Sequence, residues 1–183
     1  MEFKKIQLNG FKSFAEKTNF LIEDGLTGIV GPNGCGKSNI VESLRWAMGE
    51  TSAKSMRGSG MEDVIFNGTS NKASKNIAEV SIIVDNANHE GPLQYKDMDQ
   101  IEVKRKIEKD KGSKFYINNK EVRARDAQMF FADLSTGAHS PSMISQGRIG
   151  ALVTAKPTDR RAILEEAANI SGLHVRRHEA ELR

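Results

Sequence analysis

Polar and apolar residues alternate over much of the chain, and a helical period replaces this alternation toward the C-terminus. Alternation and short apolar runs predict β-strands. The predicted strands are residues 3–8, 18–22, 26–30, 64–66, 78–84, 101–108 and 114–118. Residues 109–112 are typical of a turn, so the last two strands form a predicted hairpin. This order of elements predicts a mixed α/β domain with an antiparallel portion.

A helical spacing of apolar residues marks further segments. Residues 38–48 place Ile40, Leu44 and Ala47 on one stripe, and Gly49 follows as a helix end. Residues 125–134 also predict a helix, and residues 135–147 predict a loop. A long helical region begins near Pro157, which suits the first turn of a helix, and continues to the last residue with an interruption at 171–172.

The C-terminal residues leave two interpretations open. Residues 174–183 are highly charged, contain few apolar side chains and end without a helix stop signal. They form either a solvated terminal helix or the start of a longer helix that continues as a coiled coil. We expect two units: an N-terminal lobe, residues 1–156, and a helix leading toward that coiled coil, residues 157–183.

Composition restricts the class of protein only in part. The chain has 183 residues, which corresponds to one domain by length. Its 27 Lys and Arg against 24 Asp and Glu give a net charge of +3, so charge alone does not indicate a nucleic-acid partner. One cysteine, Cys35, excludes an internal disulfide, and no apolar run approaches the length of a membrane span. Because no signal-peptide pattern is present, we expect a reducing cytoplasm.

The most informative motif is GPNGCGKS at residues 31–38, which fits G-x-x-x-x-G-K-[ST] between a predicted strand and a predicted helix. Its glycines allow the backbone to curl so that N–H groups and the helix N-terminus face phosphate groups. Lys37 would bind the β and γ phosphates, and Ser38 would offer its hydroxyl to Mg²⁺. The sequence therefore predicts a nucleotide phosphate-binding loop.

Six separated motifs resemble the N-terminal head segment of structural maintenance of chromosomes (SMC) proteins, with the bacterial chromosome-partition members as the nearest likeness. They are GFKSF at 10–14, GPNGCGKSNIVESLRWAMGE at 31–50, AKSMRG at 53–58, DVIFNG at 63–68, SQGRI at 145–149 and RRAILEEAANISGL at 160–173. The resemblance covers essentially the whole chain. It implies an ABC-type P-loop ATPase half-head, an α/β fold whose mixed sheet combines antiparallel strands with a P-loop strand and whose C-terminal helix leads to a coiled coil.

The resemblance also implies which residues hold ATP and Mg²⁺. Ser38 and Gln146 would bind the metal ion, and Gln146 would also sense the γ-phosphate as the Q-loop glutamine. Arg57 resembles the arginine of a loop that links DNA binding to the ATPase, and Lys12 resembles a position near the phosphates or the base. The full implied nucleotide-binding set is Lys12, Gly31, Pro32, Asn33, Gly34, Cys35, Gly36, Lys37, Ser38, Asn39, Arg57 and Gln146.

Two segments imitate further parts of such an ATPase. Residues 82–85 look like an apolar strand ending in a metal-binding aspartate, but Asn86 follows where an ABC ATPase carries its catalytic glutamate. Residues 134–137 look like the signature that caps a partner's γ-phosphate, yet they precede Gln146, which is the wrong order. We interpret both as structural and expect the true Walker B motif, signature and switch histidine in a C-terminal segment.

The resemblance implies an ATPase head as the function. Two heads would sandwich ATP, each completed by the C-terminal head segment of its own polypeptide, and hydrolysis would drive chromosome condensation, DNA loop formation and segregation. A kleisin subunit would bridge the heads, and DNA would bind mostly without sequence specificity. The protein would be cytoplasmic and nucleoid-associated, with no membrane partner.

Three other functions stay open at this point. The chain could be the head of another ABC-type DNA maintenance or repair ATPase, a self-sufficient P-loop enzyme, or a DNA-binding fragment in which nucleotide is incidental. The missing catalytic glutamate argues against the second of these, and the intact loop with Gln146 argues against the third. We expect the chain alone to hydrolyse no ATP, because water activation and the partner's signature reside elsewhere.

Overall fold

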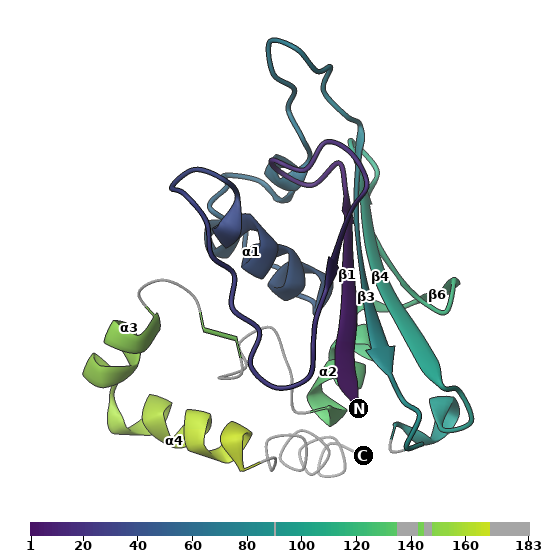
Figure 1. Cartoon of the computed structure of the whole chain (residues 1–183), viewed down its shortest axis with the longest axis vertical. Helices are drawn as coiled ribbons and strands as arrows, with labels where there is room; N and C mark the ends of the chain where they lie inside the picture. Colours follow the sequence, from purple (N-terminus) through teal and green to yellow (C-terminus); the bar gives the residue numbers. More distant parts are fainter. Residues whose placement is uncertain (90, 135–142, 145–147, 169–183) are drawn as a thin grey trace.

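The computed structural model describes residues 1–89, 91–134, 143–144 and 148–168, and Figure 1 shows their arrangement. The strands in this part of the chain are β1 (Glu2–Asn9), β2 (Thr18–Leu21), β3 (Ile77–Asp85), β4 (Gln100–Glu108), β5 (Gly112–Ile117) and β6 (Lys120–Val122). The α-helices are α1 (Lys37–Ala47), α2 (Ala124–Asp133), α3 (Arg148–Thr154) and α4 (Pro157–Ala167). Short 3₁₀ turns are η1 (Lys54–Met56), η2 (Met61–Val64) and η3 (Leu93–Tyr95).

One six-stranded sheet in the order β2-β1-β3-β4-β5-β6 organises the described residues, and every neighbouring pair is antiparallel. Alternate residues of β3 and β4 are buried, as the alternating sequence predicts. The register places Ile82 opposite Val103 and Val80 opposite Arg105, so these side chains share one face. That face carries the core and contacts the helix α1.

The helix α1 packs against β3 and β4 on this buried face (Figure 1). Its predicted stripe is confirmed, because Ile40, Leu44 and Ala47 are all buried. Trp46 is fully buried as well, and its ring centroid lies 5.4 Å from that of Phe11. Hydrophobic burial along one side of α1 therefore fixes the helix to the sheet and leaves its N-terminus beside the loop at residues 31–36.

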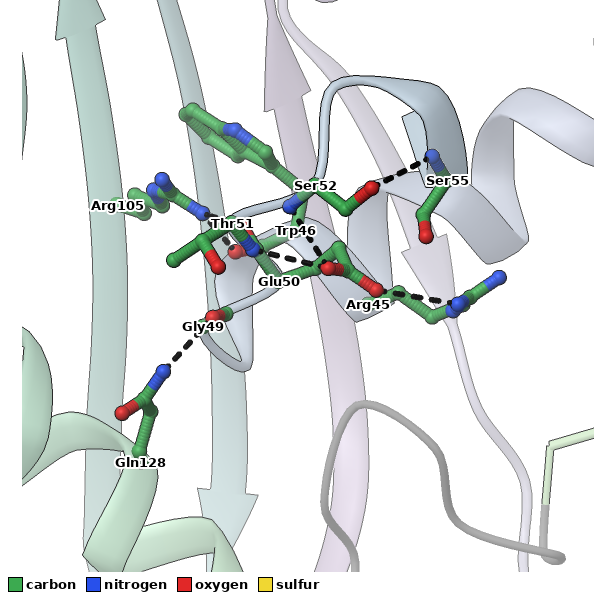
Figure 2. Close-up of polar contacts among 9 residues, drawn as sticks. All are labelled: Arg45, Trp46, Gly49, Glu50, Thr51, Ser52, Ser55, Arg105 and Gln128. Atoms are coloured by element: carbon green, nitrogen blue, oxygen red, sulfur yellow. Dashed lines mark hydrogen bonds and ion pairs between the residues drawn. The ribbon is translucent and has the colours of Figure 1, made fainter. Parts of the chain in front are cut away.

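Arg105 of β4 binds the C-terminal end of α1 and the turn after it (Figure 2). The residue is 4% exposed, and its Nη1 donates to the carbonyl oxygens of Trp46 and Glu50, each at 2.7 Å. Its Nε donates to Ser113 Oγ at 2.7 Å, and its guanidinium carbon lies 4.5 and 4.7 Å from the ring centroids of Trp46 and Phe115. Burial lowers the pKa of Arg105 to about 10, so it stays charged at neutral pH and complements the helix C-terminus.

The turn after α1 is held by its own polar contacts (Figure 2). Glu50 Oε1 accepts hydrogen bonds from the backbone N–H groups of Thr51 at 3.0 Å and Ser52 at 2.9 Å. Gln128 of α2 donates to the carbonyl oxygen of Gly49 at 2.8 Å. These bonds give partners to backbone groups of the turn, and they fix where the chain leaves α1.

Most of the predicted elements are confirmed, within a residue or two at their ends. Residues 26–30, however, form no strand, and Leu26 and Val30 are 96% and 92% exposed. A strand needs a neighbour for its N–H and C=O groups, and no described segment pairs with these residues. Hence the sheet is antiparallel throughout the described residues, and the predicted P-loop strand is wrong for this chain by itself.

Three further differences have local causes. Residues 64–66 were predicted as a strand, but Val64 is the last residue of the 3₁₀ turn η2, and Ile65 makes a single bridge to Phe11. The strand β6 and the helix α3 were not predicted. β6 is only three residues long, and α3 contains Gly150, a poor helix former that weakens the helical pattern in the sequence. Of the predicted loop 135–147 only residues 143–144 are described. Residues 169–183 also lie outside the described residues, so the division at residue 156 stays a prediction, although α4 begins at Pro157 as expected.

Candidate nucleotide site

The loop at residues 31–36 has the backbone shape that its glycines allow. Gly34 and Gly36 have φ values of 81° and 93°, in the left-handed region that favours glycine. At Gly36 an added Cβ would lie 2.8 Å from Ser13 Oγ, so this position also lacks room for a side chain. α1 then begins at Lys37 without a side-chain cap, and the N–H groups of Asn39 and Ile40 donate to the carbonyl oxygen of Gly36 at 2.9 and 3.2 Å. The glycine geometry and the helix start therefore match the backbone arrangement that anion sites at helix N-termini use, and phosphate binding here stays a prediction.

Lys37 curls back across this loop. Its Nζ donates to the carbonyl oxygens of Gly31 at 2.7 Å and Pro32 at 2.5 Å, and it lies 3.9 Å from Cys35 Sγ. Residues 31–35 are all exposed, so the loop opens to solvent. The structure thus places the predicted cation in the loop with an open path for a phosphate group.

Ser38 and Asn39 occupy the first turn of α1. Ser38 is exposed, as a hydroxyl that meets a hydrated Mg²⁺ would need to be. Asn39 Nδ2 donates to Ser13 Oγ at 2.9 Å, and Asn39 Oδ1 accepts from Arg57 Nη2 at 2.8 Å. The segment GFKSF and the loop with Arg57 therefore meet at the start of the phosphate-loop helix, although they are far apart in sequence.

Glu42 joins two of the predicted site residues, and the sequence analysis missed it. Its carboxylate pairs with Lys12 Nζ through one oxygen and lies 2.5 Å from Arg57 Nε through the other. Lys12 also donates to the carbonyl oxygen of Met56, and its side chain is only 13% exposed. Lys12 is therefore bonded within the protein, and its contact with nucleotide stays a prediction. In the sequence, Glu42 stands four residues after Ser38 and so lies on the same helix face, and this spacing could have indicated that Glu42 lies near the candidate site.

The remaining predicted positions divide between structural roles and undescribed residues. Gln146 lies outside the described residues, as do residues 135–137 of the signature-like segment. Asp85 Oδ1 accepts from the Ala87 N–H at 2.9 Å, and Asn86 donates to the carbonyl oxygens of Met98 at 2.7 Å and Tyr95 at 3.1 Å. Among the described residues, no group of three or more His, Cys, Asp or Glu side chains could hold a metal ion. Ser38 is thus the described candidate for Mg²⁺.

A family model described as "RecF/RecN/SMC N terminal domain" matches residues 2–148. The chain belongs to this family. The Chromosome partition protein Smc of Cereibacter sphaeroides is 58% identical over 183 residues, which are 100% of this chain and 16% of that protein. The Smc of Rhodopseudomonas palustris is 55% identical over 183 residues, with 100% and 16% covered. The chain therefore spans about a sixth of the length of these curated relatives.

Solved SMC heads share the fold. One, described as "Structural biochemistry of ATP-driven dimerization and DNA stimulated activation of SMC ATPases", has a TM-score of 0.79 at 28% identity and covers 91% of this chain and 99% of that one. Another, the SmcHead bound to the C-winged helix domain of ScpA, has a TM-score of 0.84 at 29% identity and covers 93% and 52%. The resemblance to an SMC N-terminal head segment and the α/β fold class are confirmed. No helix within the described ranges is long and apolar enough to cross a membrane.

Proposed function

We propose that this SMC N-terminal domain binds ATP–Mg²⁺ as one half of an ATPase head. The observation that carries the proposal is the loop at residues 31–36, with its left-handed glycines, in front of the open N-terminus of α1. Lys37 would move from the loop carbonyl oxygens to the β and γ phosphates, which are stronger partners for a cation. Ser38 would bind Mg²⁺, and Gln146 would complete its shell. Asn33, Gly34, Cys35 and Asn39 would line the loop around the phosphates.

We propose that the C-terminal head segment of the same polypeptide completes the domain. The apolar residues at 26–30 support this, since Leu26 and Val30 are almost fully exposed. An apolar segment with unpaired backbone groups is a ready partner for an added strand. Pairing there would turn residues 26–30 into the predicted P-loop strand and would fix the loop that follows. The C-terminal segment would also supply the catalytic glutamate and the signature.

We propose that the complete head acts as a dimer. Two heads would enclose ATP between the loop of one and the signature of the other, and hydrolysis would separate them. SMC ATPases with this fold are described with ATP-driven dimerization and DNA-stimulated activation, and an SmcHead is described with bound ScpA. By this analogy a kleisin subunit and DNA would be partners, and DNA would be held mostly through its phosphates. The work of the whole protein would be chromosome condensation, loop formation and segregation at the nucleoid in the cytoplasm.

The relatives named Chromosome partition protein Smc favour this function over that of another DNA maintenance or repair ATPase, since they match along the whole chain. The test is the affinity for ATP–Mg²⁺, measured by calorimetry on the full-length protein. Lys37→Ala removes a charge-assisted contact, so we expect a loss of about 1.5–3 kcal/mol, or roughly tenfold to over a hundredfold in affinity. Equal affinities of the wild type and Lys37→Ala would refute the proposed site.

A further inference from the structure

The carboxylate of Glu42 is buried between two cations of unequal exposure. Glu42 is 7% exposed and lies on α1, while Lys12 and Arg57 come from separate loops. The side chain of Lys12 is 13% exposed, whereas that of Arg57 is 58% exposed. Lys12 is thus enclosed together with Glu42, whereas part of the Arg57 side chain is exposed to solvent.

Arg57 is held against the first turns of α1 by two residues of that helix. Its Nε lies 2.5 Å from Glu42 Oε1, and its Nη2 donates to Asn39 Oδ1 at 2.8 Å. Residues three apart on a helix lie on one face, so Glu42 and Asn39 present a two-point acceptor to the planar guanidinium. This arrangement fixes the direction of the arginine side chain, which a single contact would not do.

The same contacts lead to the phosphate loop. Asn39 Nδ2 donates to Ser13 Oγ at 2.9 Å, and Ser13 Oγ lies 2.8 Å from the position that an added Cβ on Gly36 would take. The guanidinium of Arg57 is therefore linked through Asn39 to Ser13, whose hydroxyl packs close to the last glycine of the loop. Arg57 and Lys12 also have φ values of 54° and 47°, a conformation that non-glycine residues keep only where their surroundings impose it.

We propose that Glu42 is a positioning residue for Arg57. Together with Asn39 it directs the exposed edge of the guanidinium toward the phosphates of a nucleotide bound at residues 31–38. Lys12 balances the charge of Glu42. This inference rests on the proposed binding of ATP–Mg²⁺ at that loop.

The test compares the dissociation constants for ATP–Mg²⁺ of full-length proteins that carry Glu42→Gln, either alone or together with Arg57→Ala. Glu42→Gln keeps the shape of the side chain and removes its charge. We expect it to weaken binding by about tenfold, because a charge-assisted contact that orients Arg57 is lost. In the Arg57→Ala background, which has no guanidinium to orient, Glu42→Gln should change the affinity by less than about twofold. Glu16→Gln, an exposed carboxylate 3.9 and 4.0 Å from its lysine partners, is the control and should bind as the wild type does.

A purely structural role for Glu42 is tested by the pair Lys12→Met with Glu42→Gln. This pair removes the enclosed cation together with its counter-charge, so the fold is not left with an unpaired buried charge. We expect the roughly tenfold loss of affinity to persist in the pair. Wild-type affinity in the pair, or an equal loss with and without Arg57, would overturn the inference alone. A wild-type protein that binds no ATP–Mg²⁺ would overturn the proposed function and the inference with it.

Discussion

Replacement of Arg105 by leucine tests how the phosphate-loop helix is held on the sheet. The leucine would fill the space of the aliphatic stem but would leave the carbonyl oxygens of Trp46 and Glu50 without the two hydrogen bonds at 2.7 Å. It would also remove the cation from between the rings of Trp46 and Phe115. Both losses act on the end of α1, whose start forms the candidate nucleotide site.

The expected loss in the free energy of unfolding is the sum of two destabilising contributions and one that offsets them. Two buried carbonyl oxygens without donors cost about 2–6 kcal/mol together. The two cation–π contacts contribute about 1–3 kcal/mol more. Against this, burial lowers the pKa of Arg105 to about 10, so removal of the charge recovers about 3 kcal/mol of desolvation. The lost contacts sum to about 3–9 kcal/mol, so after the recovered desolvation we expect a net destabilisation of about 3 kcal/mol, the middle of a range of about 0–6 kcal/mol.

The assay is urea unfolding of the purified chain, with thermal unfolding as the second probe. A loss of about 3 kcal/mol should lower the unfolding midpoint by roughly 5–15 °C for a domain of this size. Lys106→Met is the matched control, since Lys106 is the next residue on β4 and faces the other side of the sheet, and it should change stability by less than about 0.5 kcal/mol. Arg105→Leu with wild-type stability would show that Arg105 does not hold α1 to the sheet.

Three further results are expected. Val30→Asp should leave the free energy of unfolding of the chain unchanged, because Val30 is 92% exposed. It should weaken binding of the C-terminal head segment by at least about tenfold. Leu93→Asp is the control, at a position on η3 that is 91% exposed, and an equal loss of binding in this variant would contradict the prediction. Alkylation of Cys35, an exposed thiol 3.9 Å from Lys37 Nζ, should slow when ATP–Mg²⁺ binds and should not slow in Lys37→Ala, as intact mass would show; an unchanged rate in a protein proven to bind ATP would place the nucleotide elsewhere. Hydrogen bonds from the backbone N–H of Gly60 and from the hydroxyl and N–H of Ser59 lower the pKa of Asp63. The ionised carboxylate of Asp63 therefore stabilises the fold above its ordinary pKa, and this stabilisation is lost as pH falls. Asp63→Asn should make stability depend less on pH below about pH 4, and an unchanged pH profile would show that these hydrogen bonds do not stabilise the fold.

The strands β3 and β4 and the helix α1 could be predicted from sequence because their signals are local. Alternation in β3 and β4 reflects one buried face, and the stripe Ile40, Leu44 and Ala47 reflects contact with that face. The run at residues 26–30 carries an equally apolar pattern. It forms no strand because strand formation depends on a partner, which pattern alone does not supply.

The backbone shape of the loop at residues 31–36 could be predicted from its motif, but the contacts around the loop could not. The glycine spacing determines the backbone shape, so positions 34 and 36 follow from residue type. The pairing of Glu42 with Lys12 and Arg57 depends on tertiary contacts between three segments that are distant in sequence. The same holds for Arg105, a charged residue at a buried strand position, which is fixed by the end of a helix elsewhere in the chain.

Steady-state ATP turnover should be measured for this chain, for the C-terminal head segment and for the two together. We expect no turnover by either part alone and turnover on the order of 0.1–1 per second by the mixture, which is slow for an enzyme. A mixture made with Lys37→Ala should be inactive. Hydrolysis by this chain alone at the rate of the mixture would contradict the claim that it is one half of an ATPase head.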